Sequence, residues 1–455
     1  DAFMLQADLV RDLRPVLYLL WGGVGFVLLI GCVNIANLVM VRASGRAREM
    51  ATRHAIGATF GRLSRQMLSE TLLLSLIGGG LGIVLGWWAL SAVPTLGLDE
   101  LPRGHEISMD LVSVTVAFAL TLIVGLLIGA VPVLRLQRMN INNSLRDEGR
   151  GGTVSRRTSL VRQALATAQV ALAFVLLIGA GLMAASFREV LKITPGFTPE
   201  GVVTAQISLP ASAYPDTASL SAASARLLEA ARSIAGVEHA GLTSSLPMSG
   251  DYSDSVIFAE GYVAKPGESL ISPSQQSVSD GYFEAMQTRV VKGRAFTASD
   301  TLDAPLAIIV DTRLAEKFWP GQDPIGRRMY RPTSMENPLA ITPETQFFNV
   351  VGVVEEVQNR GLATGFQPVG AYYWAQSQLP DRGVALALRT KTSPESVVNS
   401  LRVKVAEINP EIPVHSVFTM MELMDQTLVG RRVPMLLAGA FALVALFLSA
   451  VGVYG

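Results

Sequence analysis

The stretch RASGRAREMATRHAIGATFGRLSRQM, residues 42–67, decides how this chain is organised. It holds six arginines and one acidic residue, and it lies between two long runs without a charged side chain, residues 15–41 and 71–98. A hydrocarbon core of about 30 Å needs about 20 helical residues, so both runs can cross a membrane. The stretch is therefore a basic loop between two predicted membrane spans.

Three further runs also lack charged side chains, namely residues 111–134, 163–187 and 433–455. The 455 residues are 50% hydrophobic and only 16% charged, which is typical of a membrane protein. Core helices of soluble proteins seldom continue this far without a charge. We therefore expect an α-helical transmembrane bundle with five spans.

The distribution of arginine orients these spans. The loop at 99–110 has four acidic residues and only Arg103, whereas the segment at 135–162 has seven arginines. Short basic loops stay on the cytoplasmic side of a membrane. The 42–67 loop and the 135–162 segment are therefore predicted to be cytoplasmic, and residues 193–430 to lie on the opposite side.

Small and amide residues in the spans predict helix packing, since small residues let helices approach closely in lipid. Packing within this bundle is the favoured interpretation of the glycines, and a dimer face is the alternative. Asn34 and Asn37 are expected to form hydrogen bonds between helices. The glycines recur four residues apart at Gly78, Gly82 and Gly86, and again at Gly125 and Gly129.

Residues 193–430 are predicted to form a folded domain, which has 17 basic and 25 acidic residues. Alternation at 203–209 predicts a half-buried strand, and a helical pattern follows until Gly236. A second helix, which Ser393 could cap, lies between the strands GVALALRT and IPVHSV. The middle of the segment, about 250–380, is rich in short strands, so we expect an α+β domain with a β-rich insertion.

An internal repeat connects the first and last spans. An offset of 418 residues aligns the pairs Arg14/Arg432, Leu19/Leu437, Leu28/Leu446 and Val33/Val451. The last span is therefore interpreted as the opening of a second copy of the unit that the first span begins.

The basic loop itself has two open interpretations. Glu49 lies four residues before Arg53, in the favourable order for an ion pair, and alanines recur at helical spacing up to Ala58. Gly57 is expected to end this short helix, and Phe60 to begin an interfacial helix that leads into the second span. The loop could be a docking face, or it could lie on anionic lipid as a retention signal.

The motifs REMATRHAIGAT (48–59) and RLSRQMLSETLLLSLIGGGLGIVLG (62–86) resemble the MacB/FtsX-type permeases of ABC transporters. TRLAEKFWPGQDPIGRRM (312–329) and NVVGVVEEVQNRG (349–361) are similar to the MacB-like periplasmic core domain. In this family Ile-Gly often follows the glutamate, whereas this chain has Met50 and Ala51. The arrangement of spans is similar to the duplicated permeases of the family.

The resemblance implies a coupling helix that docks on a cytoplasmic ABC ATPase. ATP would act through this partner subunit, membrane lipid would surround the spans, and permease units would form a dimer or pseudo-dimer. The implied location is the bacterial inner (plasma) membrane, with residues 193–430 periplasmic or extracellular. The residues implied for the coupling loop are Arg46, Arg48, Glu49, Ala51, Arg53, Ala55, Gly57 and Ala58.

The expected organisation has six parts. The spans, together with the family resemblance, imply a periplasmic tail (1–13), an FtsX-like unit of three spans (14–136), a basic cytoplasmic linker (137–162), a fourth span (163–192), a MacB-like periplasmic core domain (193–430) and the start of a second unit (431–455).

We looked for catalytic chemistry and expect none in this chain. The nearest approach to a phosphate-binding loop, residues 321–328, has Arg in place of Lys and lacks the hydroxyl that binds magnesium. The four histidines are scattered, and no metal, cofactor or nucleic-acid site is expected. The predicted function is a permease that transmits ATP-driven motion for efflux or extraction. The alternative is a membrane-anchored binding or signalling module without ATP coupling.

Overall fold

A computed structural model describes residues 14–91, 109–137, 156–263, 265, 267–334, 337–362 and 369–454. The chain divides into two compact units. The bundle comprises residues up to Glu189 together with Val429 onward, and the head comprises Val190–Leu428.

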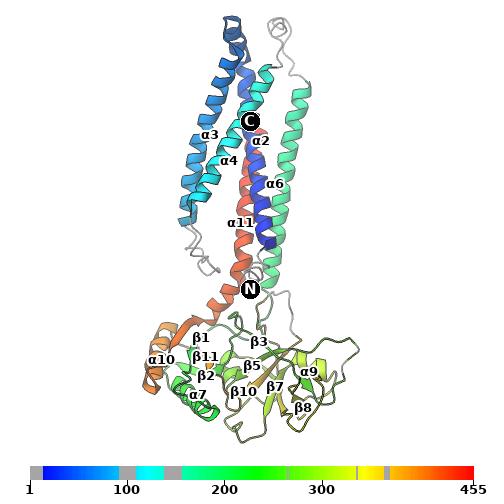
Figure 1. Cartoon of the computed structure of the whole chain (residues 1–455), viewed down its shortest axis with the longest axis vertical. Helices are drawn as coiled ribbons and strands as arrows, with labels where there is room; N and C mark the ends of the chain where they lie inside the picture. Colours follow the sequence, from blue (N-terminus) through cyan, green and yellow to red (C-terminus); the bar gives the residue numbers. More distant parts are fainter. Residues whose placement is uncertain are drawn as a thin grey trace. The chain divides into compact units, whose positions relative to one another are not determined.

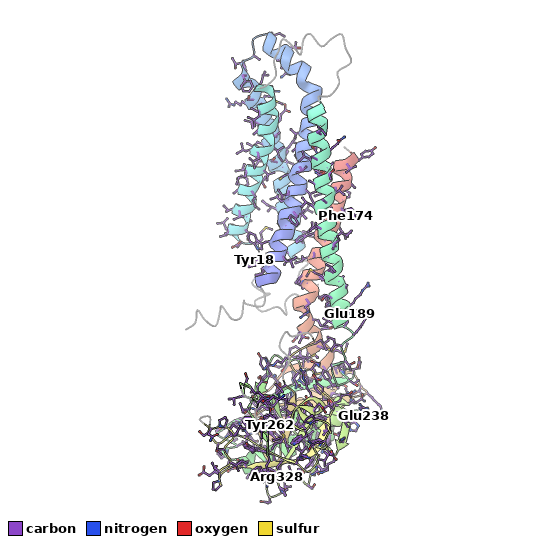
Figure 2. All side chains as sticks on the ribbon, turned by 90° about the vertical axis from the view of Figure 1, so that its right-hand side faces the viewer. Tyr18, Phe174, Glu189, Glu238, Tyr262 and Arg328 are labelled. Atoms are coloured by element: carbon purple, nitrogen blue, oxygen red, sulfur yellow. The ribbon has the colours of Figure 1, made fainter. Side chains whose placement is uncertain are left out.

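The bundle contains long helices (Figure 1), and many large hydrophobic side chains are exposed on them. Over the described residues, five helices are long and apolar enough to cross a membrane. Tyr18 and Phe174 point outward from them (Figure 2), as expected for side chains that face lipid. The helices are α2 (Arg14–Ala55), α3 (Phe60–Ser91), α4 (Leu111–Gln137), α6 (Arg156–Val190) and α11 (Met420–Tyr454).

Helix α2 is longer than the span it contains. The 42 residues of α2 measure about 63 Å at about 1.5 Å per residue, whereas its candidate span is Leu17–Val39. The predicted short helix before Gly57 is therefore not separate, because α2 continues to Ala55 without a break. The predicted interfacial helix at Phe60 is likewise the first part of α3.

Helices α3 and α4 pack antiparallel through glycines on one face of each helix. A Cβ added to Gly125 would lie 2.7 Å from Ser75 Oγ, and one added to Gly79 would lie 2.5 Å from Thr121 Cγ2. One added to Gly129 would meet Thr71. Close backbone approach of this kind is how helices associate in lipid.

The glycine stripe of α3 differs from the predicted one by a single position. Gly79 faces α4, whereas a Cβ added to Gly78 or Gly82 would have no atom within 4 Å in the described chain. A Cβ added to Gly86 would lie 3.4 Å from Met109 Cε, which is ordinary contact. Sequence spacing alone could not say which of three consecutive glycines, 78–80, turns toward the neighbouring helix.

A second group of bundle helices comprises α2, α6 and α11, which run alongside one another in both views (Figures 1 and 2). Ile30, Ala173 and Ala445 form a small buried cluster, one residue from each helix. Val27 and Leu448 pack against it. Helices far apart in sequence are thus joined within this unit.

The described strands of the head form one mixed sheet in the order β12-β1-β11-β2-β5-β10-β7-β9-β8-β4. β3 pairs with β5, and β6 pairs with β9. The strands are β1 (Val202–Ser208), β2 (Val237–Thr243), β3 (Ser253–Asp254), β4 (Phe258–Ala259), β5 (Ser274–Val278), β6 (Val290–Gly293), β7 (Ala307–Asp311), β8 (Arg328–Tyr330), β9 (Phe347–Val354), β10 (Ala371–Ala375), β11 (Gly383–Thr390) and β12 (Val414–Thr419). The helices are α7 (Thr217–Arg232), α8 (Tyr282–Met286), α9 (Thr312–Phe318) and α10 (Pro394–Ile408).

The head contains two separate hydrophobic cores. The first lies between the strands β1, β2 and β11 and the helices α7 and α10, with Leu227 and Leu401 at its centre. The second joins β7, β9, β10 and α9. The two parts of the sheet meet through one residue pair of β2 and β5, Thr243 and Val278. This confirms the expected α+β domain with a β-rich insertion.

The head differs from the sequence prediction in two local features. β1 is more buried than predicted, because Thr204, on the face expected to be exposed, is buried and donates a hydrogen bond to the Phe418 carbonyl (2.9 Å). α7 ends at Arg232, before Gly236, which adopts φ +90° in the turn into β2.

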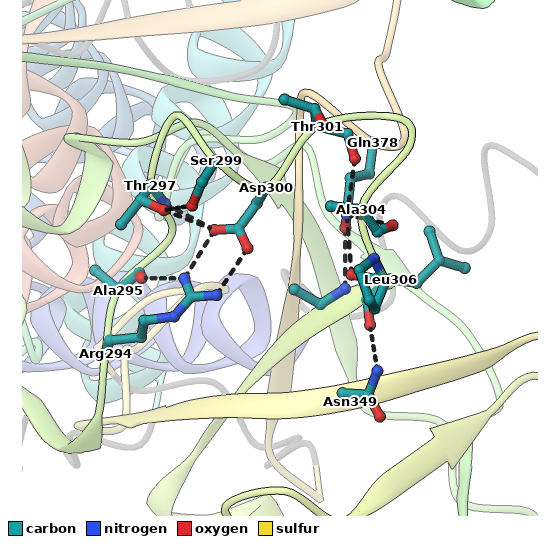
Figure 3. Close-up of polar contacts among 12 residues, drawn as sticks. Arg294, Ala295, Thr297, Ser299, Asp300, Thr301, Ala304, Leu306, Asn349 and Gln378 are labelled. Atoms are coloured by element: carbon teal, nitrogen blue, oxygen red, sulfur yellow. Dashed lines mark hydrogen bonds and ion pairs between the residues drawn. The ribbon is translucent and has the colours of Figure 1, made fainter.

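A polar cluster fixes the loop that precedes β7 (Figure 3). Arg294 donates two hydrogen bonds of 2.8 Å to the carboxylate of Asp300. Gln378, which follows β10, accepts from the Ala307 amide at 2.9 Å and donates to the Thr301 carbonyl at 3.1 Å. These bonds satisfy loop carbonyls that the sheet does not pair.

Strand β12 leads directly into α11. The Thr419 amide donates to Glu422 Oε2 (2.7 Å), and the Glu422 amide donates to Thr419 Oγ1 (3.2 Å). This reciprocal arrangement is a capping box, which satisfies free amides at a helix start. The edge strand of the head therefore passes into a helix with no loop between them.

Candidate coupling hairpin

The turn between α2 and α3 has a defined geometry that starts with glycine. Gly57 adopts φ +104°, a left-handed conformation that favours glycine. The Ala58 amide then donates to the Arg53 carbonyl at 3.0 Å, closing a Schellman-type helix end. The Thr59 carbonyl accepts from Arg62 (3.0 Å) to begin α3. Two long helices are thus joined by a short, ordered turn.

A chain of polar contacts connects the two arms of this hairpin. The Arg53 guanidinium donates to Glu49 Oε1 at 2.5 Å and to Gln66 Oε1 at 3.1 Å. Gln66 Nε2 in turn donates to Glu70 Oε1 at 3.4 Å. The predicted Glu49–Arg53 pair is therefore present. Because both side chains are about half exposed, the pair alone adds little stability, but Arg53 also ties α2 to α3.

The end of the hairpin presents an apolar side chain. Ile56 is 82% exposed, and Gly57 beside it has no atom near its Cβ position in the described chain. An isolated exposed isoleucine is common on protein surfaces. Here it is placed by a fixed turn, with Arg62 and Arg65 exposed at the start of α3.

The structure brings the predicted loop residues onto this one hairpin. Residues 46–55 lie in the last turns of α2, and Gly57 and Ala58 form the turn. The side chains of Arg46, Arg48, Ala51 and Ala55 lie outside the described residues. Sequence reasoning did not identify Ile56 or Gln66. The 13-residue separation of Arg53 and Gln66 leaves no periodic signal, because a turn rather than a helix face joins them.

An amide cluster lies within the bundle. Gln169 of α6 donates to Asn34 Oδ1 (2.7 Å), and Asn34 of α2 donates to the Leu448 carbonyl of α11 (2.5 Å). Ser449 donates to the Gln169 carbonyl at 3.3 Å. All three side chains are buried. The prediction that Asn34 bonds between helices is confirmed.

Among the residues that the structure describes, no group of three or more His, Cys, Asp and Glu side chains could hold a metal ion. The hairpin offers arginine donors, carboxylates and an apolar tip.

Two family models match the chain. The model described as FtsX-like permease C-terminal matches residues 21–141, which hold the hairpin. The model described as MacB-like periplasmic core domain matches residues 164–404, more than half of the chain.

Two curated relatives match over part of their length. The Pyoverdine export ATP-binding/permease protein PvdT of Pseudomonas fluorescens (strain Pf0-1) is 32% identical over 149 residues, 32% of this chain and 21% of that protein. The Macrolide export ATP-binding/permease protein MacB of Marinobacter nauticus is 29% identical over 142 residues, 31% of this chain and 21% of that protein. The matched part of the chain thus spans about a fifth of these relatives.

Solved structures of isolated domains also match at low identity. The periplasmic region of MacB from Actinobacillus actinomycetemcomitans is 12% identical, with a TM-score of 0.33, over 52% of this chain and 96% of that one. The extracellular domain of the noncanonic ABC-type transporter YknZ from Gram-positive bacteria is 13% identical, with a TM-score of 0.29, over 47% and 100%.

The sequence motifs, the membrane helices and the two family models agree. The chain belongs to the MacB/FtsX-type family of ABC transporter permeases, with a MacB-like periplasmic core domain.

Proposed function

We propose that this chain transmits ATP-driven conformational change from a cytoplasmic ATPase to its head, for efflux or extraction of a client. The unbroken course of α2 carries the proposal. From Met40 to Ala55, α2 extends about 24 Å beyond its candidate span as one helix. A displacement of the hairpin would move the span with it, because no flexible joint separates them.

The path to the head would use α11. The capping box at Thr419 and Glu422 fixes the start of this helix against the end of β12. Because β12 pairs with β1 in the sheet, a tilt or shift of α11 would act on the sheet of the head rather than on a loose linker.

The proposed partner is an ATP-binding subunit on the cytoplasmic side of the bacterial inner membrane. The arginines of residues 42–67 favour this side, and both relatives are named ATP-binding/permease proteins. We infer that the ATPase contacts the hairpin around Ile56, which would insert into an apolar cleft, while nearby arginines meet acidic side chains.

Ile56→Asp in the full chain tests the docking role. Recovery of an ATP-hydrolysing partner after affinity purification from native membranes should fall about tenfold or more, as when a buried anchor is lost from an interface. Ile56→Met is the matched control, because it keeps an apolar side chain of similar size, and it should retain the partner.

Equal recovery with Asp and Met at position 56 would contradict the docking role. Absence of any ATPase partner with the unaltered chain would contradict the whole proposal, and the head would then act without ATP coupling.

A further inference from the structure

Helices α2 and α11 meet through residues that are equivalent in the internal repeat. The offset of 418 residues, which the sequence alone provides, pairs Gly23 with Phe441 and Asn34 with Gly452. In the structure a Cβ added to Gly23 would lie 2.9 Å from Phe441 Cδ2, and one added to Gly452 would meet Asn34. Both contacts thus join a residue to its own equivalent.

Two further pairs of equivalent residues lie between these two contacts. Val27 is equivalent to Ala445, and Ile30 to Leu448. All four belong to one packed cluster. The α2 positions 23, 27, 30 and 34 are spaced by four, three and four residues, which is the spacing of a coiled-coil seam.

Contact between equivalent residues indicates a two-fold relation between the helices. In a parallel pair related by a two-fold axis, the residues nearest the axis face their own copies. Parallel repeats in membrane transporters are related by an axis along the membrane normal. Within the bundle α2 and α11 run in the same direction (Figure 1), as this relation requires.

The paired residues nevertheless differ in size in a complementary manner. Glycine of α2 receives Phe441, and glycine of α11 receives Asn34. Val27 of α2 packs against the cluster that contains its smaller equivalent, Ala445. A pair of two α2 helices would place Gly23 opposite Gly23 and Asn34 opposite Asn34. A pair of two α11 helices would place Phe441 against Phe441.

We propose that α2 and α11 are the equivalent helices of two repeated permease units, and that their facing residues have diverged so that each helix prefers the other to a second copy of itself. The two units of one chain would then pair with each other, and this chain would not form homodimers through these helices. The hydrogen bond that the Asn34 side-chain amide donates to the Leu448 carbonyl (2.5 Å) sets the register of the pair. The inference rests on the repeat and does not depend on ATP coupling.

Disulfide trapping in the full chain tests the pairing. Cys32, the single cysteine, is replaced by Ser, and Val27→Cys is combined with Ala445→Cys, one layer between Gly23 and Asn34. Oxidation in native membranes should give an intramolecular bond between these two positions. Val27→Cys alone should give no cross-linked dimer.

Exchange of the side-chain sizes at positions 23 and 441 tests whether size complementarity determines the pairing. In the two-cysteine background, Gly23→Phe places Phe against Phe and should lower the intramolecular yield about fivefold or more, as overpacking does. Phe441→Gly should also lower it, since it leaves a gap. The combination of Gly23→Phe with Phe441→Gly restores one large and one small residue, so the intramolecular yield should return to that of the two-cysteine background. Gly25→Phe is the control, because Gly25 has no atom near its Cβ position in the described chain.

Two results would overturn the proposal. One is a combined variant that cross-links no better than Gly23→Phe alone, because complementarity would then have no effect. The other is a Val27→Cys chain that forms intermolecular dimers as readily as the two-cysteine chain closes on itself. Neither result depends on whether an ATPase binds the hairpin.

Discussion

The bundle and the head are held together by different interactions. In the described residues of the bundle the buried cluster at Ile30 is small, and the helices meet through glycine contacts and amide hydrogen bonds. The head has two large hydrophobic cores and ion pairs at its surface. Lipid is as apolar as a leucine side chain, so burial of leucine drives folding in water but not between helices in a membrane. The same chain therefore uses two sets of interactions.

The largest expected effect of a single substitution is in the head core. Leu401→Ala removes a fully buried side chain of α10 and should destabilise the head by about 2–5 kcal/mol. Hydrogen exchange of α10 and β1 peptides in the intact chain measures the loss. Val403→Ala, at a 59% exposed position of the same helix, should change the free energy of unfolding derived from exchange by less than about 0.5 kcal/mol.

Glycine to alanine substitutions in the bundle should produce a smaller effect. In Gly129→Ala the new Cβ meets Thr71 and lies 3.0 Å from Leu68 Cδ2, and overpacking of this kind costs about 1–3 kcal/mol. The midpoint of thermal unfolding in detergent should fall. Gly82→Ala is the matched control, since no atom lies near its Cβ position in the described chain and alanine favours helix by about 1 kcal/mol. If both variants lose stability alike, close packing of α3 on α4 is not what holds these helices together.

An effect of similar size, which depends on pH, is expected for the ion pair of Arg294 and Asp300. Burial opposes the charge of Asp300, whose side chain is 5% exposed, but hydrogen bonds from Arg294 and Thr297 outweigh it and lower the pKa. A lowered folded pKa gives stability that is present above the unfolded pKa of about 4 and is lost as pH falls through the folded pKa. Arg294→Met should cost about 1.5–3 kcal/mol at pH 7 and less at pH 3, measured by exchange of the 294–306 loop.

A surface pair provides the comparison for this prediction. Arg328 and Glu260 form a bidentate contact, but both side chains are more than a third exposed. Arg328→Met should therefore cost less than about 1 kcal/mol. An equal loss for both variants would mean that burial of Asp300 does not strengthen its pair.

Much of this architecture could be predicted because the signals are local. Charge-free runs predict the spans, and alternation at 203–209 predicts β1. The continuity of α2 to Ala55 could not be read in the same manner, since the switch from apolar to basic side chains resembles a boundary although the helix continues. The hydropathy of a segment indicates whether lipid or water surrounds it, but it does not indicate where the helix ends.

Contacts between distant residues were not predictable. The repeat at an offset of 418 residues makes Asn34 and Gly452 equivalent, but only the structure brings them together. The bond from Arg53 to Gln66 depends on the turn at Gly57, and the buried face of Thr204 depends on β12, more than 200 residues later. Such contacts follow from the assembled fold and not from a local pattern.

The most direct test of the proposed transmission is a distance measurement across the whole chain. Spin labels at Gly61→Cys on α3 and Ala225→Cys on α7, in a Cys32→Ser background, are compared by pulsed electron resonance with the ATPase partner bound, before and after addition of a non-hydrolysable ATP analogue. The account predicts that the distance distribution shifts with nucleotide and that Ile56→Asp abolishes the shift. An unchanged distribution with the ATPase bound and nucleotide present would contradict it.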